Sequence, residues 1–150
     1  MTERAENVIR ADAVVAQNFE LVDKDGGTRA KLTTTTDKDV GVNFYDRQGN
    51  ARIILAVQEE GNATISLADH NQKERIRISS GATRNAITIF DRMQRTRLLL
   101  QLDPEVDGPE IHMVDEIGNP QIILTQVGPD TDNPSPRVLV RDPDGRFREV

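Results

Sequence analysis

The chain has 150 residues, a net charge of -6 and no cysteine, and only 3% of its residues are aromatic. One ordinary domain with a hydrophobic core fits this length, whereas disulfide-stapled scaffolds and thiolate metal sites are excluded. The acidic balance argues against general binding to nucleic acid or to an anionic membrane, which requires an excess of Lys and Arg.

Residues 1–18 differ in pattern from the rest of the chain. Their charged start leads into no long apolar run, so we expect neither a secretory signal nor a membrane helix of ~20 apolar residues. Synthesis in a cytosol is expected, with release into a virion or an extracellular assembly as the other route. Helical and alternating spacings fit residues 8–15 equally well. This arm is therefore expected either to fray or to dock on a neighbouring subunit.

From Phe19 onward the sequence repeats one pattern six times, and the aligned Asp residues are 22 to 27 positions apart. The residues two and four positions before each Asp are apolar, as Val42 and Phe44 are before Asp46, and this alternation predicts a half-buried strand. Gly or Gln follows three positions after the Asp, and Arg or Gln follows six positions after it. Such a period predicts a repeat architecture. The residues predicted to form the turns and a charge ladder are Asp23, Gly26, Arg29, Asp46, Gly49, Arg52, Asp69, Arg75, Asp91, Arg97, Asp115, Gly118, Asp142, Gly145 and Arg148.

The residue types after each Asp predict a tight hairpin turn. Asp142-Pro143-Asp144-Gly145 has the composition of a type I turn closed by a left-handed Gly. The first Asp can accept a hydrogen bond from a backbone N–H two residues on. The third and fourth copies carry Gln72 and Gln94 in place of Gly. We expect strain of about 1 kcal/mol, or another turn type, in those two copies.

The repeated Arg has two interpretations. It is expected to neutralise a ladder of Asp residues stacked at sheet spacing, because like charges in such a ladder repel. The alternative is an array that binds an anionic or crystalline surface.

The apolar pattern predicts that both faces of each hairpin need cover. With the expected turn, the residue two before the Asp opposes the Arg six after it. The apolar positions seven and nine after the Asp then lie on the other face. Either the chain bends at the turn, so that the two arms belong to different sheets, or adjacent coils or subunits cover the second face.

An all-β fold follows, with six hairpin repeats of ~23 residues forming a β-prism or β-solenoid that is expected to oligomerise. A homotrimer in which each chain supplies one wall of a triangular prism is one form of it. A β-trefoil is the alternative, because that fold also needs six hairpins. We divide the chain into an N-terminal arm, residues 1–18, and a repeat domain, residues 19–150.

No residue cluster predicts catalysis, a cofactor or a metal. His70 and His112 lack a second ligand at metal spacing. Asp23-Lys24-Asp25-Gly26 begins like a calcium loop, as does the last turn, but neither has the required downstream Glu. Asp130 and Asp132 add only a further acidic cluster, and Ser79 and Ser80 lack a nucleophile-elbow context.

The string Phe19-Glu-Leu-Val-Asp-Lys-Asp-Gly-Gly-Thr-Arg-Ala-Lys-Leu32 resembles a group of uncharacterised bacterial proteins. Their repeats read apolar-x-apolar-x-D-x-x-G-x-x-R-x-x-L, and the resemblance covers residues 9–150. The chain is also similar, less closely, to shaft repeats of phage tail fibres. Neither resemblance implies particular functional residues, and the third and fourth copies lack the Gly.

These observations predict a non-enzymatic structural protein without cofactors. Its expected partners are further copies of itself, with a trimer favoured, and other subunits of a fibre, appendage or larger assembly. The alternative is a carbohydrate-binding, lectin-like trefoil module. Such a module would stack sugars on exposed aromatic side chains, for which Tyr45, Phe90 and Phe147 are the candidates.

Overall fold

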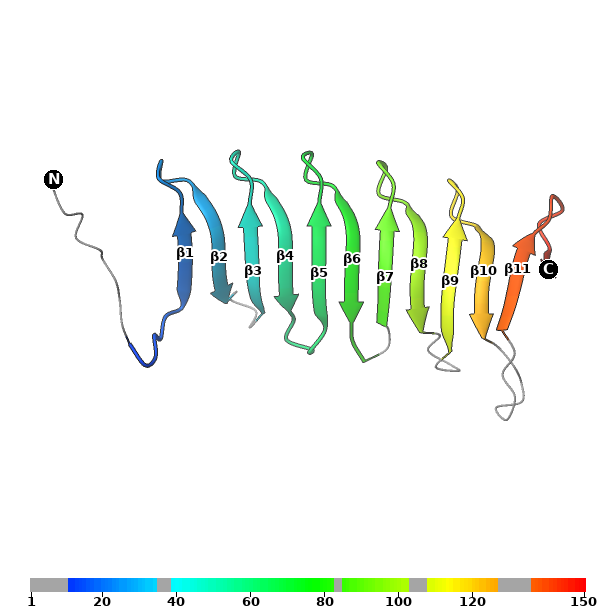
Figure 1. The fold of residues 1–150 in the computed structure, drawn as a ribbon, viewed down its shortest axis with the longest axis horizontal. Coiled ribbons are helices and arrows are strands. Elements are labelled where there is room, and N and C mark those ends of the chain that lie inside the picture. The colour runs from blue at the N-terminus through cyan, green and yellow to red at the C-terminus, as the bar shows by residue number, and fades with distance from the viewer. Residues whose placement is uncertain (1–10, 35–38, 83–84, 103–107, 127–135) are drawn as a thin grey trace, which may run out of the picture.

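The computed structural model describes residues 11–34, 39–82, 85–102, 108–126 and 136–150. They form one antiparallel sheet in which the strands follow each other in chain order (Figure 1). Its strands are β1 (Asn18–Val22), β2 (Thr28–Thr34), β3 (Val40–Tyr45), β4 (Ala51–Val57), β5 (Ala63–Ala68), β6 (Glu74–Ser80), β7 (Asn85–Phe90), β8 (Thr96–Leu102), β9 (Pro109–Val114), β10 (Pro120–Gln126), β11 (Pro136–Arg141) and β12 (Phe147–Glu149).

The predicted all-β fold of six hairpin repeats is confirmed, since each copy folds into one hairpin of two strands. The trefoil alternative is wrong, because every strand pairs only with its neighbours in the sequence and the sheet stays open. Each copy adds two strands to the stack. The twelve strands have eleven spacings of ~4.8 Å, so the sheet extends over about 53 Å. A solenoid in which each copy formed one coil, with one strand spacing per copy, would extend over only ~30 Å.

The turns have the predicted conformation. In the second copy the N–H of Gly49 donates to the carbonyl oxygen of Asp46 (3.1 Å). The N–H of Asp46 donates in turn to the carbonyl oxygen of Asn50 (3.0 Å). Gly49 has φ 82°, the left-handed value that closes a type I turn in a hairpin. Gln72 and Gln94 adopt φ 61°, so these two non-glycine residues occupy the strained conformation expected for them.

The predicted register across each hairpin is wrong in the first five copies. Phe44 lies opposite Ile53, seven positions after the Asp, and not opposite Arg52. A second bulge, where Ala51 and Arg52 together oppose Tyr45, inserts the extra residue. Equivalent register shifts occur in the first, third, fourth and fifth hairpins. The hairpins therefore stay flat and do not bend at the turn into a second sheet.

One face of the sheet is apolar in every strand from β1 to β11, and we call it the apolar face. The bulge puts the positions two and four before the Asp on the same face as those seven and nine after it. The row nearer the Asp turns consists of Leu21, Ala30, Phe44, Ile53, Leu67, Ile76, Ile89, Leu98, Met113, Ile122 and Val140. The central row consists of Phe19, Leu32, Val42, Leu55, Ile65, Ile78, Ile87, Leu100, Ile111, Leu124 and Val138.

The opposite face, here called the mixed face, alternates polar and apolar residues. Its central row includes Lys31, Asn43, Ile54, Arg77 and Leu99. The prediction that both faces are apolar therefore holds fully for one face and only in part for the other.

A single layer of strands leaves almost no interior. Among the described residues only Ala86 and Thr125 are buried, with exposed fractions of 7% and 8%. Figure 1 shows the strands nearly upright and side by side across the row. Sheets of this length are usually twisted, and flat ones are usually stabilised by stacking on another layer.

The two sides of the sheet at which the strands begin and end differ in their connections, and we name each of these sides an edge. The six Asp turns all lie on one edge, at the top of Figure 1, which we call the turn edge. The other edge, where successive hairpins are joined, is the loop edge.

Two predicted features lie wholly or partly outside the strands. Of the predicted N-terminal arm, residues 1–18, residues 1–10 lie outside the described residues, residues 11–17 form no strand, and Asn18 begins β1. Asp130 and Asp132 also lie outside the described residues. The described part of the chain contains no helix long and apolar enough to cross a membrane.

Candidate functional site

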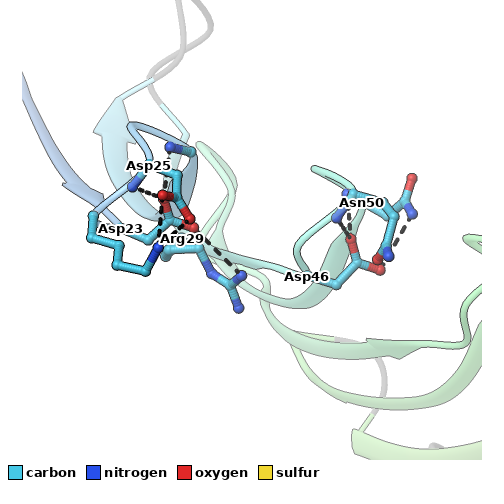
Figure 2. Close-up of polar contacts among 8 residues, drawn as sticks. Asp23, Asp25, Arg29, Asp46 and Asn50 are labelled. Carbon is cyan, nitrogen blue, oxygen red and sulfur yellow. Dashed lines mark hydrogen bonds and ion pairs between the residues drawn. The ribbon is translucent and has the colours of Figure 1, made fainter.

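The Asp turns are the most regular polar feature of the structure. Oδ1 of Asp46 accepts hydrogen bonds from the backbone N–H groups of Gln48 (2.9 Å) and Asn50 (3.0 Å). Asp23 makes the same pair of contacts with Asp25 (3.0 Å) and Gly27 (2.9 Å). Figure 2 shows Asp23 beside Asp25 and Asp46 beside Asn50. The Asp carboxylate thus caps two backbone donors that the turn leaves without a partner.

Hydrogen bonding to the charged form keeps these carboxylates ionised. The backbone N–H of Gly27 lowers the pKa of Asp23, the N–H of Asn50 lowers the pKa of Asp46, and that of Asn119 lowers the pKa of Asp115. At Asp69 and Asp91, loss of contact with water raises the pKa. The turn amides and the neighbouring Arg side chains outweigh this effect, so both pKa values are lowered as well.

The cation predicted six positions after the Asp faces its own Asp in three hairpins. Arg75 Nη2 lies 2.6 Å from Asp69 Oδ2, Arg52 Nη1 lies 3.6 Å from Asp46 Oδ2, and Arg29 Nη1 lies 4.0 Å from Asp23 Oδ2. Gln121 takes this place in the fifth hairpin, where its Nε2 donates to Asp115 Oδ2 (2.7 Å). The side chain therefore completes the cap of its own turn.

Two hairpins depart from this arrangement. In the fourth, Arg95 pairs with Asp91 (2.8 Å), while Nη1 of Arg97 is buried without a hydrogen-bond partner. In the sixth, no second bulge is present, so Arg148 lies opposite Val140 on the apolar face.

Gly26, Gly118 and Gly145 occupy their turns at φ 84°, 93° and 82°. The Asp142 carboxylate accepts from the N–H of Arg146 (2.9 Å).

The interpretation of the Asp residues as a ladder at sheet spacing is wrong. One Asp occurs for every two strands, so neighbouring carboxylates are separated by about 9.6 Å, close to the ~8 Å Debye length of physiological salt. Arg29, Arg52 and Arg75 each form an ion pair with the Asp of their own hairpin. Asp–Asp repulsion is therefore weak, and capping explains the pattern.

Some of these Arg side chains also connect neighbouring hairpins. Nε of Arg52 donates to the carbonyl oxygen of Ala68 (2.8 Å), and Nη1 of Arg95 donates to that of Glu116 (2.8 Å). These contacts depend on which hairpin lies next to which, so they could not be predicted from the sequence.

The described residues contain no group of three or more His, Asp or Glu side chains that could hold a metal ion. His70 is exposed in its turn. His112 lies on the mixed face with Nε2 3.0 Å from Oε2 of Glu110, which also accepts from Gln101 (3.0 Å). Oγ of Ser80 donates a hydrogen bond to Oδ1 of Asn85 (2.7 Å).

The three aromatic candidates for sugar stacking are not grouped. Tyr45 and Phe90 are half-buried on the mixed face, two hairpins apart, and the guanidinium of Arg77 covers the Phe90 ring at 5.6 Å from its centroid. Phe147 is exposed on β12.

The apolar face extends over eleven strands. Because the second bulge places the apolar positions of both arms on this one face, the sequence alone did not predict it. Many of its side chains are exposed although they are large: Phe44 by 42%, Ile65 by 37% and Met113 by 46%. Two shallow depressions lie on it towards the loop edge. One of about 390 Å³ is lined mainly by Val40, Val57, Ala63 and their neighbours. The other, of about 420 Å³, extends from β6 to β9.

Neither depression has convergent polar groups, so this surface fits protein packing better than chemistry. No protein-family model matches the chain, and no significant similarity to a curated protein is found.

Proposed function

We propose that the chain is a non-enzymatic structural protein whose copies associate through the apolar face. Three copies would enclose their apolar faces in a triangular β-prism, which forms or decorates a fibre, appendage or larger assembly. The observation that carries the proposal is the unbroken apolar surface over eleven strands, whose side chains remain exposed in the single chain.

The size of this surface supports self-association. Two rows ~7 Å wide over about 53 Å cover roughly 700 Å² of plane, above the ~300–600 Å² of the largest patch on a typical monomer. Three such faces together cover about 2,100 Å², at the lower end of the range for obligate interfaces. A domain normally buries its sheet face against a second layer, and the described residues provide none.

The geometry of one wall favours three copies. A strand of six or seven residues makes a wall about 20–24 Å wide. Three walls of that width enclose a triangle whose centre is ~6–7 Å from each wall. Half the spacing of packed sheets is ~5 Å, so one layer of side chains per wall fills such an interior.

Sedimentation of two matched variants tests the proposal. Ile65 and Thr64 are adjacent in β5 but lie on the apolar and the mixed face. We expect I65K to lose the oligomer or to fail to fold, because it buries a charge in the interface, whereas T64K stays oligomeric. A wild-type chain that is a folded monomer at micromolar concentration, or equal behaviour of the two variants, would contradict the proposal.

A further inference from the structure

We infer that the copies meet head to tail in a closed ring of three, with the turn edge of each chain packed against the loop edge of the next. This inference rests on the proposed function. It further specifies which rows of the apolar face form each corner of the prism and fixes the relative direction of the chains.

In β5 and β6, side-chain size at the two margins of the apolar face is complementary. The row at the turn edge has Leu67 in β5 and Ile76 in β6. At the loop edge the same two strands end in the small residues Ala63 and Ser80, which line the depression of about 390 Å³. In a head-to-tail ring without stagger, the two large side chains of one copy face this depression in the next.

Charge at the edges points to the same arrangement. On either side of β4 and β5 the turn edge carries the exposed cations Arg47, at the tip of its turn, and Lys73, at the base of the next turn, whereas the first and the last two turns expose Asp25, Glu116 and Asp144. The loop edge carries the exposed Glu60 in the loop between β4 and β5. When the turn edge of one copy packs on the loop edge of the next, these opposite charges come together. This favours head-to-tail packing over packing of two turn edges or two loop edges.

The absence of cysteine from the chain allows a direct cross-linking test. We would introduce L67C and A63C together, at the two ends of one face of β5. Their Cα atoms within one chain are about 13 Å apart, so no intrachain disulfide is possible. Any disulfide must join two copies, and a ring closes after three links.

The expected result after oxidation, with no free thiol remaining, is a covalent species of three times the chain mass on non-reducing gels. L67C alone and A63C alone should give no such species. The pair I53C and V57C in β4 has the same geometry and serves as a second test if the first pair fails to fold.

The other outcomes separate this inference from the proposed function. Complete oxidation to a covalent dimer would overturn the ring of three. Free thiols in a double variant that still sediments as an oligomer would overturn head-to-tail packing and leave self-association standing. A double variant and wild type that are both folded monomers would remove both.

Discussion

Arg52 connects two successive repeats, because its Nε donates to the carbonyl oxygen of Ala68 at 2.8 Å across the boundary between hairpins. The same side chain reaches back to Asp46, with Nη1 3.6 Å from Oδ2. One guanidinium thus stabilises its own turn and holds the next hairpin beside it, a geometry that a single ammonium does not reproduce.

We expect R52K to lower the free energy of unfolding by about 1 kcal/mol, since the bond to Ala68 is lost while the charge remains. Denaturant unfolding at fixed protein concentration measures this. R47K is the control, because Arg47 is exposed at the tip of the same turn, and its effect should stay within about 0.5 kcal/mol. Equal effects of the two substitutions would contradict the role assigned to Arg52.

The two strained turns offer sites for stabilisation. Gln72 and Gln94 both adopt φ 61° where other copies have Gly. We expect Q72G and Q94G each to raise the free energy of unfolding by about 1 kcal/mol, because Gly adopts this conformation without a Cβ clash. Q48G, one position earlier in the second turn, is the control and should be neutral or destabilising. Destabilisation by Q72G would show that the Gln side chain makes a contribution larger than the strain.

The turns could be predicted from the sequence because their determinants are local. An Asp with a Gly three positions later selects one turn type, and four of the six copies have this pair. Even the strain at Gln72 and Gln94 follows from such local chemistry.

The register could not be predicted in the same way. No residue type marks the second bulge that sets Ile53, and not Arg52, opposite Phe44. That bulge is favoured by the whole sheet, since it collects the apolar residues of all strands on one face. Arg148, in the hairpin without it, occupies the apolar face instead. A shift of one residue exchanges the two faces, so the continuous apolar face became evident only from the structure.

Acid should destabilise the protein through its turns. The pKa values of Asp23, Asp46, Asp69, Asp91 and Asp115 are lowered in the folded chain. Their stabilisation is therefore complete above the unfolded value of ~3.9 and is lost as the pH falls through the lower folded values.

The variant D46N isolates one turn in this acid response. Asn keeps an oxygen that can accept from Gln48 and Asn50 but cannot titrate. We expect D46N to be less stable than wild type at pH 7 and to approach it in acid, as followed by denaturant midpoints between pH 7 and pH 2. A constant difference across this range would contradict a titrating cap at Asp46.

The repeats should be removable as whole units. Deletion of residues 63–84 joins Asn62 to Asn85 and removes one hairpin. β4 then meets β7 in the register it now has with β5, so that Leu55 opposes Ile87 as it opposes Ile65. Both apolar rows remain continuous. Because each repeat contacts only its neighbours, stability should fall by about one repeat's share while folding and self-association persist.

Deletion of residues 63–73 is the matched control, since it removes one strand and its turn and reverses the direction of every later strand. We expect this variant to misfold or aggregate. Circular dichroism and sedimentation distinguish the two deletions. If the longer deletion also loses the β spectrum, the sheet folds only as a whole. That result would contradict the prediction, which rests on each strand pairing only with its neighbours in the sequence.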